Sequence, residues 1–195
     1  MIRFFIVSIF ILMPSTFADE ARDELIVQTV LKLKSFNYEN SSDKVKGSIT
    51  RYLNKNIGIG EYFTLIDKFS IRDQLSNLAN LSTAENINNE AVSLLVRLGG
   101  YDWISKLLKE KGESRMNFIR AIGTVNSKIT VQVLSELVQG MSTSDANAAS
   151  DALTKSALGQ AELLNLLKRK KLPSSVVEKT LKVLATSADP EVRKM

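Results

Sequence analysis

The chain has 195 residues, of which 44% are hydrophobic and 24% are charged, and its formal net charge at pH 7 is +5. A chain of this length and composition can bury one core of ordinary size or an elongated stack of small cores. It contains no cysteine and no histidine. Their absence excludes thiol nucleophiles, Ser-His-Asp triads, most zinc sites and haem attachment through a C-x-x-C-H motif.

Residues 1–18 have the pattern of a secretory signal peptide. Arg3 supplies a basic start, an apolar run follows, and Thr16 and Ala18 place small residues at the −3 and −1 positions of a cleavage site. The apolar run is shorter than the roughly 20 residues that span a bilayer. We therefore expect cleavage before Asp19, export to the periplasm or the extracellular space of a bacterium, and no stable membrane span in the mature chain.

Two predicted helices, over residues 19–36 and 43–54, make up an N-terminal part at residues 19–56. In the first helix Ile26, Val30 and Leu33 share one face, as the 3.6-residue period requires. The second helix is short and amphipathic in the same way. Gly58-Ile59-Gly60 then separates this part from the rest of the chain.

Residues 61–69 and 71–81 are predicted to form one helical hairpin. A polar connection follows, in which Ser82 or Thr83 is the expected N-cap of the next helix. Residues 87–108 then show helical spacing on both sides of Gly99-Gly100, which predicts two helices folded back to back across a glycine turn.

The same pattern continues towards the C-terminus. Residues 115–122 and 129–138 predict a second hairpin, and an alanine-rich helix follows, whose small side chains permit the close approach of a neighbour. We expect Ser144 or Asp145 to cap that helix and Leu158-Gly159 to end it. The last predicted helices cover residues 160–168, a segment capped by Ser174 or Ser175, and a start at Asp189-Pro190.

A bulky aliphatic residue followed by glycine ends a predicted first helix at Leu98-Gly99, Ile122-Gly123 and Leu158-Gly159. The intervals are 24 and 36 residues, so the repeat is irregular. We therefore predict an all-α chain that forms an irregular α-solenoid, in which each helical hairpin buries one face against its neighbours. A compact all-helical bundle is the alternative, because the same apolar stripes also permit it.

Several segments resemble the HEAT-like helical repeat segment of large exported bacterial proteins, where it lies between a propeller-like dehydrogenase-type domain and a cytochrome c-type haem domain. The resemblance covers residues 54–195 and is carried by residues 65–74, 94–100, 163–173 and 189–193. It implies HEAT-like repeats over residues 57–195. Neither flanking domain is present in this chain, and no catalytic or cofactor residue carries over from the family.

Two surface motifs are candidate binding sites. Lys168, Arg169, Lys170 and Lys171 form a basic run that can bind a polyanion or an anionic lipid, although such a run is also typical of a solvated turn at a helix C-terminus. Tyr101, Asp102 and Trp103, beside the glycine turn, can anchor a protein partner, although Trp103 can equally pack into a neighbouring repeat. In both cases we favour the structural interpretation.

The chain shows no motif that assembles catalytic chemistry. Paired carboxylates such as Asp23 and Glu24, or Asp67 and Asp73, are the residue type of a glycosidase, but sequence proximity does not establish the geometry that glycosidases need. Charges of both signs are interspersed along the predicted helices, so we expect no nucleic-acid partner. We also expect no cofactor and no metal site.

These features favour a non-catalytic, exported helical-repeat scaffold that binds a protein partner along one face. The resemblance implies an alternative, an accessory or remnant subunit of an extracytoplasmic redox complex whose haem partner is a separate chain. A third possibility is polyanion or anionic-lipid binding through the basic run at residues 168–171.

Overall fold

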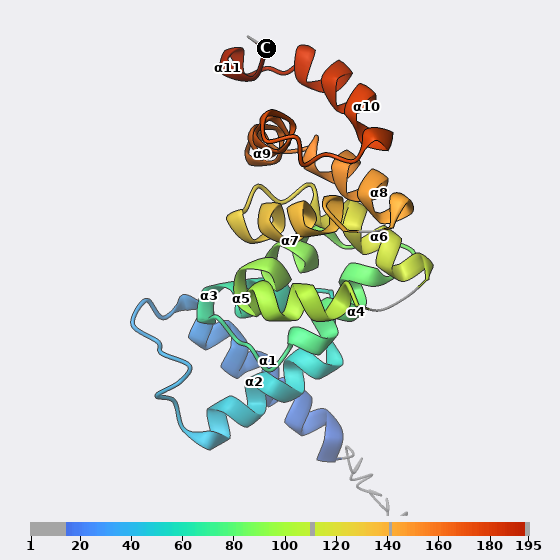
Figure 1. The fold of residues 1–195 in the computed structure, drawn as a ribbon. Coiled ribbons are helices and arrows are strands. Elements are labelled where there is room, and N and C mark those ends of the chain that lie inside the picture. The colour runs from blue at the N-terminus through green and yellow to red at the C-terminus, as the bar shows by residue number, and fades with distance from the viewer. Residues whose placement is uncertain (1–14, 110–111, 141, 194–195) are drawn as a thin grey trace, which may run out of the picture. The chain divides into compact units, whose positions relative to one another are not determined.

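The computed structural model describes residues 15–109, 112–140 and 142–193, and all regular secondary structure in this part of the chain is α-helical (Figure 1). None of the described helices combines the length and the apolarity that crossing a bilayer requires. In chain order the helices are α1 (Ser15–Lys32), α2 (Asp43–Lys55), α3 (Tyr62–Phe69), α4 (Leu75–Thr83), α5 (Asn89–Leu107), α6 (Glu113–Ile122), α7 (Lys128–Val138), α8 (Thr143–Leu153), α9 (Ala157–Lys168), α10 (Ser174–Ala185) and α11 (Pro190–Arg193).

The chain divides into two compact units, with the boundary between Ile57 and Gly58. In the first unit, α1 packs against α2. Ser42 caps α2, because its side-chain oxygen accepts a hydrogen bond from the backbone N–H of Val45. α1 ends at Lys32 rather than at Phe36.

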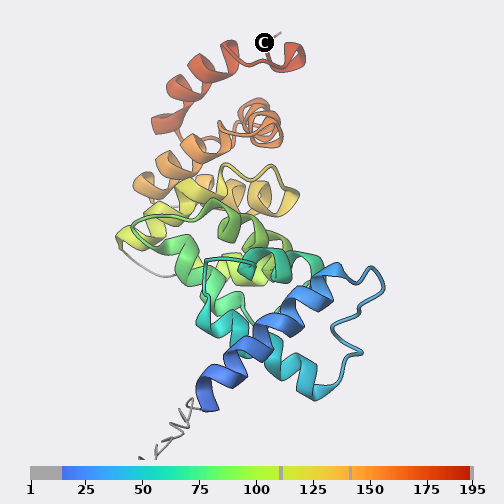
Figure 2. The same ribbon diagram turned by 180° about the vertical axis from the view of Figure 1, so that it is seen from behind.

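The second unit contains α3 to α11, and its helices pack in two rows (Figures 1 and 2). In the first row, α4, α6, α8 and α10 each pack against the next member. In the second row, α5, α7, α9 and α11 do the same, and α3 packs against α5. Contacts such as α4 with α5 and α7 with α8 join the two rows. Each helix therefore buries its apolar side against helices near it in the sequence.

Polar contacts also join successive members of each row. In the first row, Arg115 of α6 makes hydrogen bonds to Asp145 of α8, and the buried hydroxyls of Ser150 and Thr180 lie 3.2 Å apart. In the second row, Tyr101 of α5 contacts Glu136 of α7, and Ser135 of α7 contacts Glu162 of α9. These pairs are separated by 27 to 35 residues in the sequence.

Small residues bring α6 and α8 very close together. A Cβ atom at Gly123, at the end of α6, would lie 2.5 Å from the carbonyl oxygen of Ala152 and 2.7 Å from its Cβ. Ala149 and Ala152 are buried on the facing side of α8. The predicted close approach of a neighbour to the alanine-rich helix is therefore confirmed.

The predicted break after residue 98 is confirmed at Gly100. This residue has φ 70° and ψ −164°, a conformation that glycine adopts and side-chain-bearing residues avoid. Gly99 is still helical, and the Trp103 side chain covers it: a Cβ at Gly99 would lie 2.8 Å from the Cβ of Trp103. The two glycines thus have different roles, one in the turn and one in packing.

The prediction that Leu158-Gly159 ends the alanine-rich helix is wrong. α8 already ends at Leu153, and Leu158 and Gly159 lie in the first turn of α9. Ser156 caps α9 by accepting a hydrogen bond from the N–H of Gly159. Glycine at this place permits close packing instead, since its Cβ would lie 2.1 Å from the carbonyl oxygen of Leu153.

Three predicted N-caps are also wrong. Ser82 and Thr83 belong to α4 and donate to its own carbonyl groups, and Asn88 caps α5 instead. Ser142, rather than Ser144 or Asp145, caps α8. At α10 the extended backbone of Pro173 precedes the helix, so Ser174 and Ser175 lie inside it and no side chain caps it. In each case the capping position is the last residue with an extended backbone before the helix. Where several polar residues follow one another, the sequence does not show which of them has that backbone conformation.

Candidate functional site

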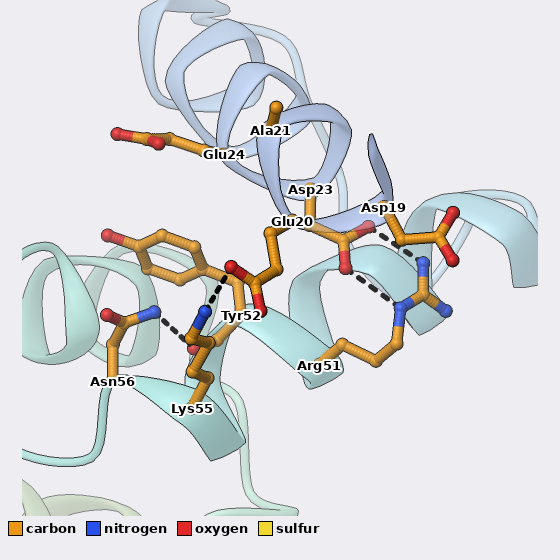
Figure 3. Close-up of a pocket in the computed structure, with 9 residues that line it drawn as sticks. All are labelled: Asp19, Glu20, Ala21, Asp23, Glu24, Arg51, Tyr52, Lys55 and Asn56. Atoms are coloured by element: carbon orange, nitrogen blue, oxygen red, sulfur yellow. Dashed lines mark hydrogen bonds and ion pairs between the residues drawn. The ribbon is translucent and has the colours of Figure 1, made fainter. Parts of the chain in front are cut away.

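A cleft of about 600 Å³ lies between the start of α1 and the last turns of α2 (Figure 3). Charged side chains from both helices line the cleft, together with Ala21 and Tyr52. Its lining consists of Asp19, Glu20, Ala21, Asp23, Glu24, Arg51, Tyr52, Lys55 and Asn56.

Ion pairs hold the two walls of this cleft together. Arg51 donates two hydrogen bonds to Asp23, from Nε to Oδ2 at 2.8 Å and from Nη2 to Oδ1 at 2.7 Å. Burial disfavours the charge on Asp23, but the hydrogen bonds of Arg51 and Ser48 outweigh burial and lower the pKa of the carboxyl group below its ordinary value. Lys55 pairs with Glu20 at the same edge, as Figure 3 shows.

This arrangement does not favour acid–base chemistry. A general acid needs a carboxyl group with a raised pKa, whereas the pKa of Asp23 is lowered. Both cations of the cleft, Arg51 and Lys55, are already paired with its own carboxylates. The cleft is therefore best described as an ion-paired joint between α1 and α2.

Tyr101, Asp102 and Trp103 do not converge on one site. Trp103 is half-buried against Gly99, and the Nζ atom of Lys106 lies 5.3 Å from the centre of its ring. Asp102 is exposed. The Tyr101 hydroxyl donates a 2.7 Å hydrogen bond to Oε2 of Glu136, so Tyr101 extends from α5 to α7.

A groove of about 480 Å³ lies between α7 and α9, and we call it the α7–α9 groove. The sequence does not reveal this groove, because its walls come from two helices that are not consecutive. The sequence signal that could point to the groove is a stripe of small, polar and apolar residues, at three- or four-residue spacing, on each of the two helices. The groove is lined by Lys128, Val131, Gln132, Ser135, Glu136, Leu158, Ala161, Glu162 and Asn165.

Two carboxylates of this groove are held by neutral donors. Glu136 accepts hydrogen bonds from Tyr101 at Oε2 and from Gln132 at Oε1. Glu162 accepts them from Ser135 at Oε1 and from Asn165 at Oε2. Within the described part of the chain, neither carboxylate has a lysine or arginine nitrogen within 4.0 Å.

The basic run at residues 168–171 lies at the C-terminal end of α9, and all four of its side chains are exposed. Lys170 has φ 56°, and the N–H groups of Lys170 and Lys171 donate to the carbonyls of Leu167 and Leu166. This geometry closes the helix, and the positive charges face its negative dipole end. No ion pair of the described residues involves the run.

Among the described residues, no group of three or more acidic side chains is placed to hold a metal ion. Asp67, one of the carboxylates of interest in the sequence, pairs with Arg97 at the surface. No protein-family model matches this chain, and no curated protein or solved structure matches it either.

Proposed function

We propose that this chain is a non-catalytic helical-repeat scaffold, an irregular α-solenoid of HEAT-like hairpins, that is exported and binds a protein partner along one face. The observation that carries the proposal is the packing of α4 to α11 in two rows, in chain order, with polar contacts between successive members of each row. Stacked helical pairs of this kind present an extended surface, which repeat proteins use for binding.

The packing pattern favours a solenoid over a compact bundle. In a bundle, helices from both ends of the unit share one core. Here, among the described helices, α4 packs against α5 and α6, and α10 packs against α8, α9 and α11. Contacts between near neighbours dominate, as expected when each pair buries its face against the next pair.

Export rests on residues 1–18, whose first fourteen lie outside the described residues. Cleavage before Asp19 would remove the first turn of α1 and leave every lining residue of the α1–α2 cleft in the mature chain. N-terminal sequencing of the protein from the extracytoplasmic fraction tests this step. A start at Asp19 is expected, and an uncleaved protein in the cytoplasm would contradict export.

Partner binding is tested by gentle affinity capture from the extracytoplasmic fraction of the source cells, with the mature chain as bait. A stoichiometric protein that survives washing and competition with untagged bait is expected. Recovery of no protein under these conditions would count against the proposal.

Anion binding by the basic run is a second candidate, favoured by the exposure of all four side chains and their lack of ion pairs among the described residues. Binding to vesicles with an anionic lipid, or to heparin, would weaken with salt and disappear in a variant with Lys168, Lys170 and Lys171 changed to glutamine. Binding that survives these substitutions would refute it.

A further inference from the structure

We infer that the α7–α9 groove is the docking site for a short segment of the partner protein that combines lysine or arginine with bulky apolar side chains. This inference rests on the proposed function, since it assigns the partner's chemistry and the face that receives it. It is carried by the exposed apolar side chains of the groove and by its two carboxylates, which form no ion pair among the described residues.

The groove offers apolar surface that the fold does not use. The Leu158 side chain is 39% exposed at one wall, and Tyr101, which reaches Glu136 from α5, is 38% exposed. Val131 and Ala161, which also line the groove, are half-buried. A partner side chain of leucine size that covers these atoms is expected to strengthen binding about tenfold, so the groove can anchor an apolar residue.

The two carboxylates of the groove lack the ion pairs that other carboxylates joining two helices make. Other carboxylates that make hydrogen bonds between helices are ion-paired within the chain: Asp23 with Arg51, and Asp145 with Arg115. Glu136 and Glu162 instead receive only neutral donors in the described part of the chain, although the protein as a whole is basic. Lys128 also lines the groove but forms no ion pair with either carboxylate. With two carboxylates and one lysine, the groove keeps a net negative charge, which favours a cation from outside.

The far end of the groove limits what can bind. On α9, Leu158, Glu162, Asn165 and Arg169 follow one another at three- or four-residue spacing, so they lie along one line of the helix surface. Arg169 lies about 10 Å beyond Glu162 along the helix axis. The exposed basic run at residues 168–171 therefore repels a long polycation, and the groove selects a short basic segment.

The same charges disfavour other occupants. A phosphate backbone or an anionic lipid headgroup would be repelled by Glu136 and Glu162. A second copy of this chain also has the required charge, in its own basic run at residues 168–171. The experiment below therefore distinguishes a second copy from a partner protein.

The test uses the full mature chain and a fluorescein-labelled helical peptide in which arginine and leucine are placed among glutamines. Fluorescence anisotropy measures the Kd of this peptide and of the same peptide with glutamate in place of arginine. We expect the basic peptide to bind and the acidic peptide to bind at least about tenfold more weakly.

Two variants of the protein locate the site. In Glu136→Gln/Glu162→Gln the Kd of the basic peptide is expected to rise about tenfold, because two exposed charge pairs are lost. The control Glu85→Gln/Glu178→Gln makes the same change of net charge at exposed positions outside the groove and should leave the Kd unchanged. The variant Leu158→Ala, at an exposed position, should weaken binding severalfold through the apolar contact alone.

Equal binding of both peptides, or an unchanged Kd in the groove variants, would overturn the inference. So would sedimentation showing a dimer of the mature chain that dissociates in Glu136→Gln/Glu162→Gln, because the groove would then belong to a second copy. If a partner captured from cells binds the groove variants as tightly as the natural protein, only this inference is overturned. If no partner is captured at all, the proposed function is overturned.

Discussion

Replacing Gly123 with alanine tests the close contact on which the stacking of the first row depends. The backbone φ of Gly123 is −61°, so any residue can adopt its conformation, and only the neighbour excludes a side chain. The added Cβ would lie 2.5 Å from the carbonyl oxygen and 2.7 Å from the Cα of Ala152. These are backbone atoms, so α6 and α8 must move apart to admit the methyl group.

The cost follows from overpacking. Inserting a methyl group into a well-packed core costs about 1–3 kcal/mol, and a contact with rigid backbone belongs at the upper end. The higher helix propensity of alanine offsets up to about 1 kcal/mol. We therefore expect Gly123→Ala to lower the free energy of unfolding by about 2 kcal/mol, measured by urea denaturation followed by circular dichroism.

Gly47→Ala provides the matched control. Gly47 lies inside α2, and its added Cβ would meet only the flexible end of Arg51, at 3.4 Å. This variant should be as stable as the natural protein or about 1 kcal/mol more stable. The double variant Gly123→Ala/Ala152→Gly should not recover stability, because the backbone contacts persist. A neutral Gly123→Ala, or full recovery in the double variant, would refute the close packing of α6 and α8.

Three further predictions concern caps and buried polar groups. Asn88→Ala should cost about 1 kcal/mol of stability in urea denaturation, because Asn88 accepts hydrogen bonds from the N–H groups of residues 90 and 91. Ser174→Ala is the control and should cost little, because Ser174 lies inside α10 and caps nothing. Equal losses of stability in the two variants would contradict the assigned caps. Arg115 lowers the pKa of Asp145 below its ordinary 3.8, so the pair stabilises the fold above that pH, and this contribution is lost as the pH falls through the lower folded-state pKa. The free energy of unfolding of the natural protein should exceed that of Asp145→Asn by about 2 kcal/mol at neutral pH and by progressively less in acid. A difference that does not depend on pH would refute this prediction. Burial raises the pKa of Tyr62 from 10.0 to about 12, so the stability that its neutral form contributes is complete below pH 10 and is lost as the pH rises towards 12. In a pH titration followed by tyrosinate absorbance, the natural protein should show a late ionisation step that is missing in Tyr62→Phe. A late step that persists in Tyr62→Phe would contradict the assignment.

Helix positions were the most predictable part of the fold. Apolar residues at helical spacing gave α6 and α7 within two residues of their observed starts, and the glycine pair predicted the break at Gly100. These features depend on neighbours in the sequence, so the sequence shows them directly. The alanine-rich helix likewise predicted close packing, which the contact between Gly123 and Ala152 confirms.

Features that depend on three-dimensional neighbours were not predictable. A glycine in a sequence can mark either a turn or a close contact between helices. Gly159 predicts a helix end, but in the structure it lies inside α9 and permits close contact with Leu153. The α7–α9 groove joins residues 27 positions apart, as in the hydrogen bond between Ser135 and Glu162. The sequence does not show which carboxylate receives an arginine and which receives only neutral donors.

Site-specific photocrosslinking in the source cells tests the central claim, that one face of the two helix rows binds a protein partner. A photoreactive residue at Gln132 or Asn165, both exposed on the second row, should give a discrete adduct with one protein. The same residue at Asn147, exposed on α8 of the first row, should give no such adduct. Adducts of equal yield from all three positions, or none from any, would contradict the account.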